Sequence, residues 1–198
     1  MRRFKNFAFA VAGLSVAALS SVAIAQAPAP AADPANTLVL ELKSGKVTIA
    51  LRPDLAPKHV ERVKALAKEG FYNGHKFHRV IEGFMAQTGD PTGTGTGGSK
   101  LGNLPAEFSS EPFRKGTIGA ARSASPDSAN SQFFICFTDF GCDSLKGKYT
   151  IWGKVVTGMQ YVDAITRGEP PSTPDTIVKM YLASDAGAAA APAAAQKK

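Results

Sequence analysis

The sequence predicts a mainly β fold, in which an antiparallel sheet or barrel packs against two helices. Short runs of alternating apolar and polar residues recur through the middle of the chain, whereas helical spacing occurs in only two places. The 19 Gly and 13 Pro residues among 198 favour many turns over long helices. With 44% hydrophobic residues, the chain can bury the core of one domain and is not wholly disordered.

The first expected element is a β-hairpin. Residues 37–43 and 46–51 alternate apolar and polar side chains on either side of Ser44-Gly45. A two-residue turn that ends in glycine between two alternating runs is typical of a hairpin.

Two helices and six further strands are expected after the hairpin. In residues 57–69 apolar side chains recur at helical spacing, with Pro57 at the start and Gly70 just past the end. Residues 159–166 form a shorter helical candidate that ends before Gly168. The other alternating runs predict strands at residues 75–80, 83–87, 117–121, 132–136, 151–155 and 176–182.

The N-terminus has the features of a secretory signal peptide, which we expect to span residues 1–25. A positively charged start precedes an uncharged, mostly apolar run over residues 7–22, and Ala23-Ile24-Ala25 places small residues at a cleavage site. The run of about 16 residues is shorter than the ~20 that a spanning helix needs, so cleavage after Ala25 is favoured over an uncleaved membrane anchor. The mature protein is then soluble and exported.

Three segments follow the expected cleavage site. Residues 26–36 are an Ala/Pro-rich linker, residues 37–185 a folded domain, and residues 186–198 an Ala/Pro-rich tail that we expect to be disordered. Five of the positive charges behind the net charge of +7 lie in the signal and the last two residues. The domain itself is mildly basic and has no Lys/Arg run, which argues against a nucleic-acid partner.

Common catalytic and metal-binding motifs are missing. There is no Gly-x-Ser-x-Gly, no His-Glu-x-x-His and no Cys-x-x-Cys. His75 and His78 lie three apart in an expected strand, so they face opposite sides and cannot share a metal, and His59 is expected on the helix surface.

The Gly-rich residues 93–98 could be interpreted as a phosphate-binding loop. They lack the Gly-Lys-Ser/Thr ending and a following helix, so a tight loop between strands is favoured.

Several long motifs carry a resemblance to a known family. Phe77-His-Arg-Val-Ile-Glu-Gly-Phe-Met-Ala-Gln-Thr-Gly-Asp90 is followed by Pro91-Thr-Gly-Thr-Gly-Thr-Gly-Gly98, then by Asn130-Ser-Gln-Phe-Phe-Ile-Cys136 and Leu145-Lys-Gly-Lys-Tyr-Thr-Ile-Trp-Gly-Lys-Val155. From about residue 37 to 182 the sequence resembles the bacterial branch of the cyclophilin family of peptidyl-prolyl cis-trans isomerases. The resemblance implies an eight-stranded antiparallel β-barrel closed by two α-helices, and catalysis without metal or cofactor.

The chemistry of such an enzyme explains why ordinary catalytic motifs are missing. Rotation about an X–Pro bond faces a barrier of ~18–20 kcal/mol, but no bond breaks. A catalyst needs an apolar slot for the proline ring and a donor that favours the twisted amide, whose nitrogen lone pair becomes available. The planar guanidinium of Arg79 can supply that donor.

The resemblance assigns roles to ten residues. The catalytic residues are Arg79, Gln87 and Phe84, and the substrate-binding residues are Met85, Arg122, Ser123, Gln132, Phe134, Leu145 and Tyr149. Phe84, Met85, Phe134 and Leu145 match the proline pocket, and the two glutamines match residues that orient the arginine and the substrate backbone.

Three departures from the family pattern affect specificity. Tyr149 stands where many eukaryotic members have histidine, and it can still close the pocket. Ser144 replaces a tryptophan that contacts cyclosporin, so weak cyclosporin binding is expected. Arg122-Ser123 follows Ala121 in place of the usual substrate-groove residues. We expect this replacement to change substrate preference without abolishing binding.

The two cysteines, Cys136 and Cys142, are six residues apart. An expected strand would have to bend sharply to bring their Cα atoms within the ~7 Å that a disulfide allows, so free thiols are favoured over a bridge.

The sequence thus predicts a monomeric prolyl isomerase of the periplasm that acts on proline-containing polypeptides during the folding of exported proteins. A non-catalytic proline-peptide binding module or holdase chaperone is the alternative. An anion- or nucleotide-binding protein that uses residues 93–98 is a third hypothesis.

Overall fold

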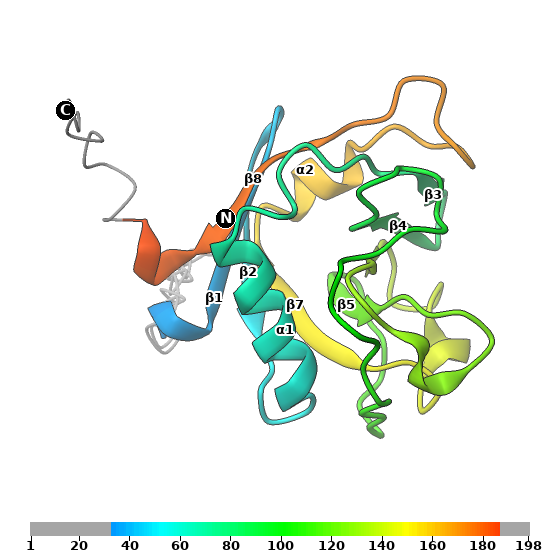
Figure 1. The fold of residues 1–198 in the computed structure, drawn as a ribbon. Coiled ribbons are helices and arrows are strands. Elements are labelled where there is room, and N and C mark those ends of the chain that lie inside the picture. Colours follow the sequence, from blue (N-terminus) through cyan, green and yellow to red (C-terminus); the bar gives the residue numbers. More distant parts are fainter. Residues whose placement is uncertain (1–32, 187–198) are drawn as a thin grey trace, which may run out of the picture. The chain divides into compact units, whose positions relative to one another are not determined.

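The computed structural model describes residues 33–186 (Figure 1). The expected signal peptide, most of the expected linker and nearly all of the expected tail lie outside these residues. The last part of the linker forms a short 3₁₀ helix, η1 (Pro34–Asn36). Within residues 33–186 no helix has the length and apolar character needed to span a bilayer.

Eight antiparallel strands form one curled sheet, in the order β3-β4-β6-β5-β7-β2-β1-β8. The strands are β1 (Thr37–Leu42), β2 (Gly45–Leu51), β3 (Arg79–Ile81), β4 (Met85–Thr88), β5 (Thr117–Ala120), β6 (Phe133–Cys136), β7 (Ile151–Thr157) and β8 (Ile177–Leu182). They curl around a common interior, with β1, β2 and β8 on one side and β3 and β4 on the other (Figure 1).

The sheet is a half-barrel and not the closed barrel that was expected. Among the described residues its edge strands, β3 and β8, do not form a ladder with each other. Isolated bridges at Lys76–Thr176 and Val80–Gly168 connect this side of the sheet to the segment before β8. That segment contains Pro170, Pro171 and Pro174, which have no backbone N–H to donate to a ladder.

Two α-helices pack on the sheet, α1 (Pro57–Lys68) against β7 and β8, and α2 (Met159–Asp163) against β2. The expectation that His59 is a surface residue of α1 is wrong, because its side chain is buried. Its Nδ1 lies 2.6 Å from Oε2 of Glu107, which also accepts the backbone N–H of His59. Glu107 therefore caps α1 from a distant loop. Burial lowers the pKa of His59, although the carboxylate opposes this effect.

Several strand boundaries also differ from the predictions, two of them at the hairpin and before β3. The hairpin turn is Lys43-Ser44, and Gly45 already pairs with Leu42 in the ladder. A Cβ at Gly45 would lie 2.4 Å from the ring of Tyr161, so this glycine permits the approach of α2 and is not a turn residue. The strand expected at residues 75–80 begins only at Arg79.

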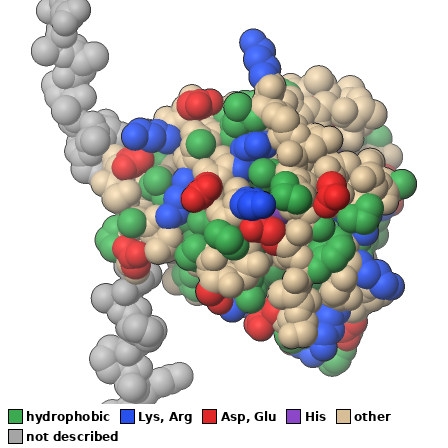
Figure 2. Space-filling view, turned by 60° about the horizontal axis from the view of Figure 1, so that its bottom comes forward, with side chains coloured by type: hydrophobic (Ala, Val, Ile, Leu, Met, Phe, Trp, Pro, Cys, Tyr) green, Lys and Arg blue, Asp and Glu red, His purple; other side chains and the backbone are tan. Residues whose placement is uncertain are grey.

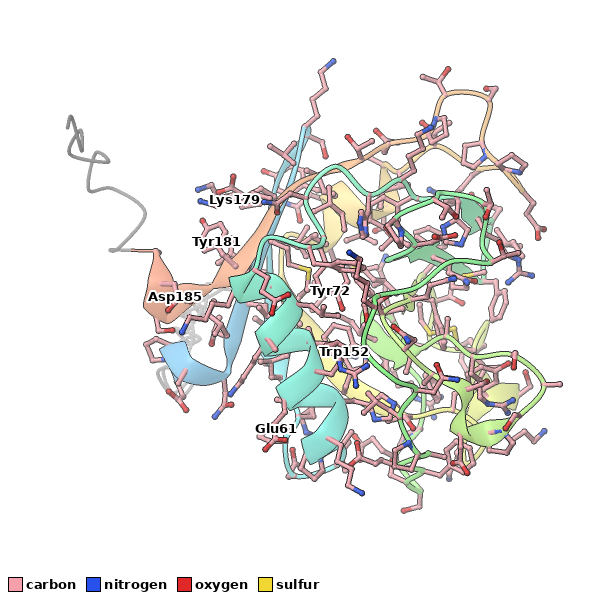
Figure 3. All side chains as sticks on the ribbon, in the orientation of Figure 1. Glu61, Tyr72, Trp152, Lys179, Tyr181 and Asp185 are labelled. Carbon is pink, nitrogen blue, oxygen red and sulfur yellow. A yellow bond between two sulfur atoms is a disulfide. The ribbon has the colours of Figure 1, made fainter. Side chains whose placement is uncertain are left out.

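Buried side chains form two clusters. The main core lies between the sheet and α1 and contains the large rings of Tyr72, Phe77, Phe133 and Trp152. Tyr72 and Trp152 both lie in the interior of the curled sheet (Figure 3). The pocket core is smaller and consists of Met85, Phe113, Phe134, Cys136, Cys142 and Ile151.

Cys136 and Cys142 form a disulfide, so the prediction of free thiols is wrong. Their Cα atoms are 6.3 Å apart, because the chain turns back sharply after β6. Gly141 permits this turn, since a Cβ there would lie 2.0 Å from the carbonyl oxygen of Gly83. The bridge joins β6 to the start of the 3₁₀ helix η3 (Asp143–Leu145).

Candidate active site

A cavity of about 110 Å³ opens beside β3, β4 and β6. Its lining consists of Arg79, Phe84, Met85, Gln87, Ala121, Arg122, Phe134, Leu145 and Tyr149. All of these except Ala121 were among the ten residues predicted from the sequence. They come from five separate stretches of the chain, and the fold brings them together around one small slot.

Apolar side chains form the floor and walls of this slot. The ring of Phe134 stacks on Phe113 at 5.9 Å and meets Tyr149 edge-on at 5.8 Å. Met85 lies opposite Cys136 in the β4–β6 ladder. Leu145 ends η3, whose first turn the disulfide ties to β6. A shallow aromatic and thioether slot of this kind suits a small saturated ring.

Arg79 lies at the rim of the slot and is about half exposed. Its Nε donates a hydrogen bond to Oε2 of Glu169 at 2.8 Å. Gln87 is its partner across the β3–β4 ladder, but Gln87 Nε2 donates to Oε1 of Gln132 at 2.9 Å. Within residues 33–186 no hydrogen bond joins the side chain of Gln87 to that of Arg79. The predicted orienting glutamine is thus beside the arginine but bound elsewhere, and the sequence analysis missed Glu169.

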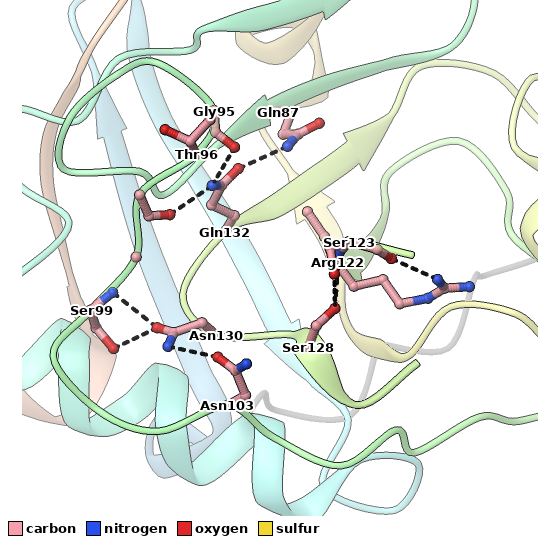
Figure 4. Close-up of a pocket in the computed structure, with 13 residues that line it drawn as sticks. Gln87, Gly95, Thr96, Ser99, Asn103, Arg122, Ser123, Ser128, Asn130 and Gln132 are labelled. Atoms are coloured by element: carbon pink, nitrogen blue, oxygen red, sulfur yellow. Dashed lines mark hydrogen bonds between the residues drawn. The ribbon is translucent and has the colours of Figure 1, made fainter. Parts of the chain in front are cut away.

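A second cavity of about 440 Å³ adjoins the slot, with Gln87, Ala121 and Arg122 lining both (Figure 4). It contains the two remaining predicted residues, Ser123 and Gln132. Five of the other eight lining residues have polar side chains and were missed from the sequence, namely Thr96, Ser99, Asn103, Ser128 and Asn130. Their side chains converge only through tertiary contacts, such as that from Ser99 Oγ to Asn130 Oδ1 at 2.7 Å.

Arg122 separates the two cavities. Its Nε and Nη2 donate to the carbonyl oxygen of Lys148 at 3.2 and 2.9 Å, and its Nη1 donates to that of Ser123 at 2.9 Å. The guanidinium lies 4.4 Å from the centroid of the Tyr149 ring. These contacts fix a cation at the wall of the slot.

The Gly-rich loop encloses a carboxylate of the protein itself. Asp90 is fully buried, and its Oδ2 accepts the backbone N–H groups of Thr94, Gly95 and Gly97 at 3.1, 2.6 and 3.1 Å. Burial alone would raise the pKa of Asp90, but these bonds and those from Thr92 outweigh it and lower the pKa to about 2. The N–H groups that could bind a phosphate are already engaged, which argues against the anion-binding hypothesis.

The same loop holds Gln132. Gln132 Nε2 donates to the carbonyl oxygens of Gly95 and Gly97 at 3.0 and 2.8 Å (Figure 4). Its Oε1 accepts from Gln87, as described above. Asp90 therefore fixes the loop, and the loop fixes the pair of glutamines.

No metal-binding cluster competes with this site in the part of the chain that the structure describes. In residues 33–186 no three His, Cys, Asp or Glu side chains are grouped so that they could hold a metal. His75 and His78 precede β3, and both are buried. Lys and Arg side chains are interspersed with Asp and Glu on the face shown in Figure 2.

Comparison with known proteins identifies the family. The family model described as cyclophilin type peptidyl-prolyl cis-trans isomerase/CLD matches residues 37–182, which is nearly the whole domain. The chain belongs to the cyclophilin family. It is a cyclophilin-type peptidyl-prolyl cis-trans isomerase, EC 5.2.1.8.

Relatives of known sequence support this assignment. A probable peptidyl-prolyl cis-trans isomerase of Brucella suis is 50% identical over 194 residues, covering 89% of this chain and 98% of its own length. A peptidyl-prolyl cis-trans isomerase of Helicobacter pylori is 42% identical over 141 residues, covering 68% of this chain and 84% of its own.

Solved cyclophilins have the same fold. A cyclophilin from Hirschia baltica superposes with a TM-score of 0.71 at 29% identity, covering 77% of this chain and 76% of its own. A Cryptosporidium parvum cyclophilin, crystallised in the presence of the dipeptide Ala-Pro, has a TM-score of 0.68 at 27% identity and covers 74% and 98%.

Proposed function

We propose that this cyclophilin isomerises X–Pro bonds of exported polypeptides, with the 110 Å³ slot as its proline pocket and Arg79 as the donor to the twisted amide. The single observation that carries the proposal is the geometry of the slot. It presents a guanidinium at the rim of an otherwise mainly apolar cavity. A binding module would need the apolar surface only, whereas a catalyst also needs a donor at the amide.

The mechanism follows from what changes during rotation. In the planar amide the prolyl nitrogen shares its lone pair with the carbonyl, and at the twisted geometry that lone pair becomes a hydrogen-bond acceptor. Phe84, Met85, Phe134 and Leu145 hold the ring, and an Nη group of Arg79 donates to the nitrogen. Because the contact forms only when the amide twists, it stabilises the transition state more than the ground state.

The adjoining 440 Å³ cavity holds the peptide next to the proline. Gln132 is fixed by the Gly-rich loop, and Ser123 and Arg122 border the path from the slot. Polar groups already held in place can bind an extended backbone without reorganising, which keeps the flanking residues still while the prolyl bond rotates.

The test compares the wild type with Arg79→Ala on a short X–Pro peptide by NMR exchange spectroscopy. Removing one positioned donor costs about 100- to 1000-fold in rate at comparable sites, so a loss of that size with little change in peptide affinity is expected. Lys154→Ala is the matched control, because it also removes one positive charge but lies outside both cavities. Unchanged catalysis in Arg79→Ala, or peptide binding without catalysis in the wild type, would favour the non-catalytic binding module or holdase.

Export to the periplasm is the second part of the proposal. It rests on the N-terminal sequence described above, and the Cys136–Cys142 disulfide suits an oxidising compartment. Fractionation of a Gram-negative host and N-terminal sequencing should find a periplasmic protein that begins at Gln26. A full-length cytoplasmic protein would contradict this.

Two further properties are proposed for the purified protein. Ser144 is exposed in η3, where it offers no large ring to cyclosporin, so we expect weak binding and not a nanomolar Kd. We also expect a monomer, which analytical ultracentrifugation at several concentrations would test.

A further inference from the structure

Glu169, in the loop between α2 and β8, holds the side chain of Arg79. Its Oε2 accepts from Arg79 Nε at 2.8 Å, and the two side chains are 52% and 42% exposed. We propose that Glu169 is the positioning residue of Arg79, an inference that rests on the catalytic role proposed above for this arginine. The acid performs the orienting function that the sequence analysis gave to Gln87, whose amide is bound to Gln132.

The backbone anchors Glu169 directly beside Arg79. Gly168 and Val80 exchange two hydrogen bonds, each of 2.8 Å, and these residues precede Glu169 and follow Arg79 in the chain. A Cβ at Gly168 would lie 2.5 Å from the Cα of Pro171, and φ there is +148°, so glycine is required at this position. The carboxylate is therefore placed by a fixed bridge and not by a freely moving loop.

Neighbouring contacts hold the rest of this loop. The Nε of Arg167 donates to Oε2 of Glu82 at 2.6 Å, and its guanidinium lies 4.1 Å from the centroid of the Phe137 ring. On the other side, Asp175 accepts the backbone N–H groups of Thr166 and Phe77 through its Oδ2 and its carbonyl oxygen. An exposed ion pair is usually weak because both partners move, but here one partner belongs to an anchored segment.

Among residues 33–186 only the Nε of the Arg79 side chain has a hydrogen-bond partner, so its Nη donors can serve a substrate. The carboxylate takes the Nε–H, while the two Nη groups at the other end of the planar fork can point toward the prolyl nitrogen and the adjacent carbonyl. Glu169 does not line the proline slot but an adjoining cavity of about 480 Å³, and Arg79 and Gln87 line both cavities. Glu169 therefore acts on the proposed reaction through Arg79, and removing Glu169 should hardly change substrate affinity.

The experiment is a double-mutant cycle that measures kcat, KM and Tm for the wild type, Glu169→Ala, Arg79→Ala and the double variant on an uncharged X–Pro peptide. Glu169→Ala should lower kcat about three- to tenfold, with KM within twofold and Tm unchanged. In the Arg79→Ala background it should have no further effect. Glu169→Gln, whose amide oxygen can accept from Nε, should restore at least half of kcat.

Asp54→Ala is the matched control, since it removes a carboxylate that accepts from the Nε of another arginine, Arg52, outside this loop and both site cavities. Its kcat should equal that of the wild type. A wild-type kcat in Glu169→Ala, an equal loss in both backgrounds, or a rise in kcat would overturn the positioning role. A wild-type kcat in Arg79→Ala would instead refute the proposed function, so the two failures are distinguishable.

Discussion

Phe133 and Phe134 are consecutive residues of β6 that serve two different regions. The ring of Phe133 meets Tyr72 and Trp152 edge-on at 5.6 and 5.3 Å in the main core. The ring of Phe134 stacks on Phe113 in the pocket core and lines the 110 Å³ slot. Both side chains are almost fully buried, at 1% and 4% exposure. Burial therefore does not distinguish the stabilising side of this strand from the functional side, whereas strand alternation does.

Substituting the two rings one at a time is the strongest test of this comparison. Phe133→Ala should lower the free energy of unfolding by about 3–5 kcal/mol, because a closely packed ring is removed from the main core. Phe134→Ala should cost less stability, since its ring already borders a cavity, but it should lower kcat/KM on an X–Pro peptide by tenfold or more. Urea unfolding followed by the single Trp152 gives the stabilities.

The comparison fails if both variants lose the same stability and the same activity per folded molecule. Because Phe133→Ala could unfold part of the sample, Phe133→Leu serves as the milder variant. It should retain the wild-type kcat/KM, with a smaller loss of stability.

The contrast between the two phenylalanines also shows how far sequence reasoning reaches. Alternation along a strand by itself places Phe133 and Phe134 on opposite faces, and the family motifs gave eight of the nine residues that line the slot. Strand alternation depends on neighbouring residues, and the slot residues lie in long sequence motifs, so both could be read from the sequence. Glu169 and Glu107 were missed because each acts on a partner far away in sequence, and no local pattern marks such a contact. The disulfide was missed for a related reason, since a tight turn at Gly141 decides whether the cysteines can meet.

Acid should destabilise the protein in two pH ranges, one set by Asp90 and one set by buried histidines. The pKa of Asp90, beside the site, falls from the ordinary 3.8 to about 2, so the unfolded chain takes up a proton first and stability falls as the pH drops from about 4 to 2. The loss amounts to about 2 kcal/mol. Burial lowers the pKa values of His59 on the α1 side and of His75 and His78 near Asp90 below the ordinary 6.5, so stability also falls as the pH drops below about 6.5.

Asp90→Asn separates the two ranges. The variant should be about 2 kcal/mol less stable at pH 7 and should lose the dependence between pH 4 and 2, while the dependence near pH 6 remains. Chemical unfolding at a series of pH values measures both. If the stability of Asp90→Asn still fell between pH 4 and 2 as it does in the wild type, other carboxylates would be responsible for that fall.

The disulfide should stabilise the pocket core more than the main core. It closes a loop of seven residues, for which chain entropy gives about 2 kcal/mol. The variant Cys136→Ala/Cys142→Ala should lose about that much stability and show a higher KM, because η3 then holds Leu145 less firmly. Trp152 lies in the main core, so its native fluorescence should not change. A changed Trp152 fluorescence spectrum with a normal KM would show instead that the disulfide stabilises the main core more than the pocket core.

The smallest expected effect concerns the wall between the two site cavities. Arg122 is the only charged residue that lines the 440 Å³ cavity, and within residues 33–186 no carboxylate oxygen lies within 4.0 Å of its guanidinium. Peptides that differ only in Glu, Gln or Lys two residues before the proline should therefore differ in kcat/KM, with Glu about threefold above Lys at low salt. The preference should vanish at 0.5 M NaCl, which screens the charge, and in Arg122→Gln. A preference that persists in Arg122→Gln would place its origin outside this wall.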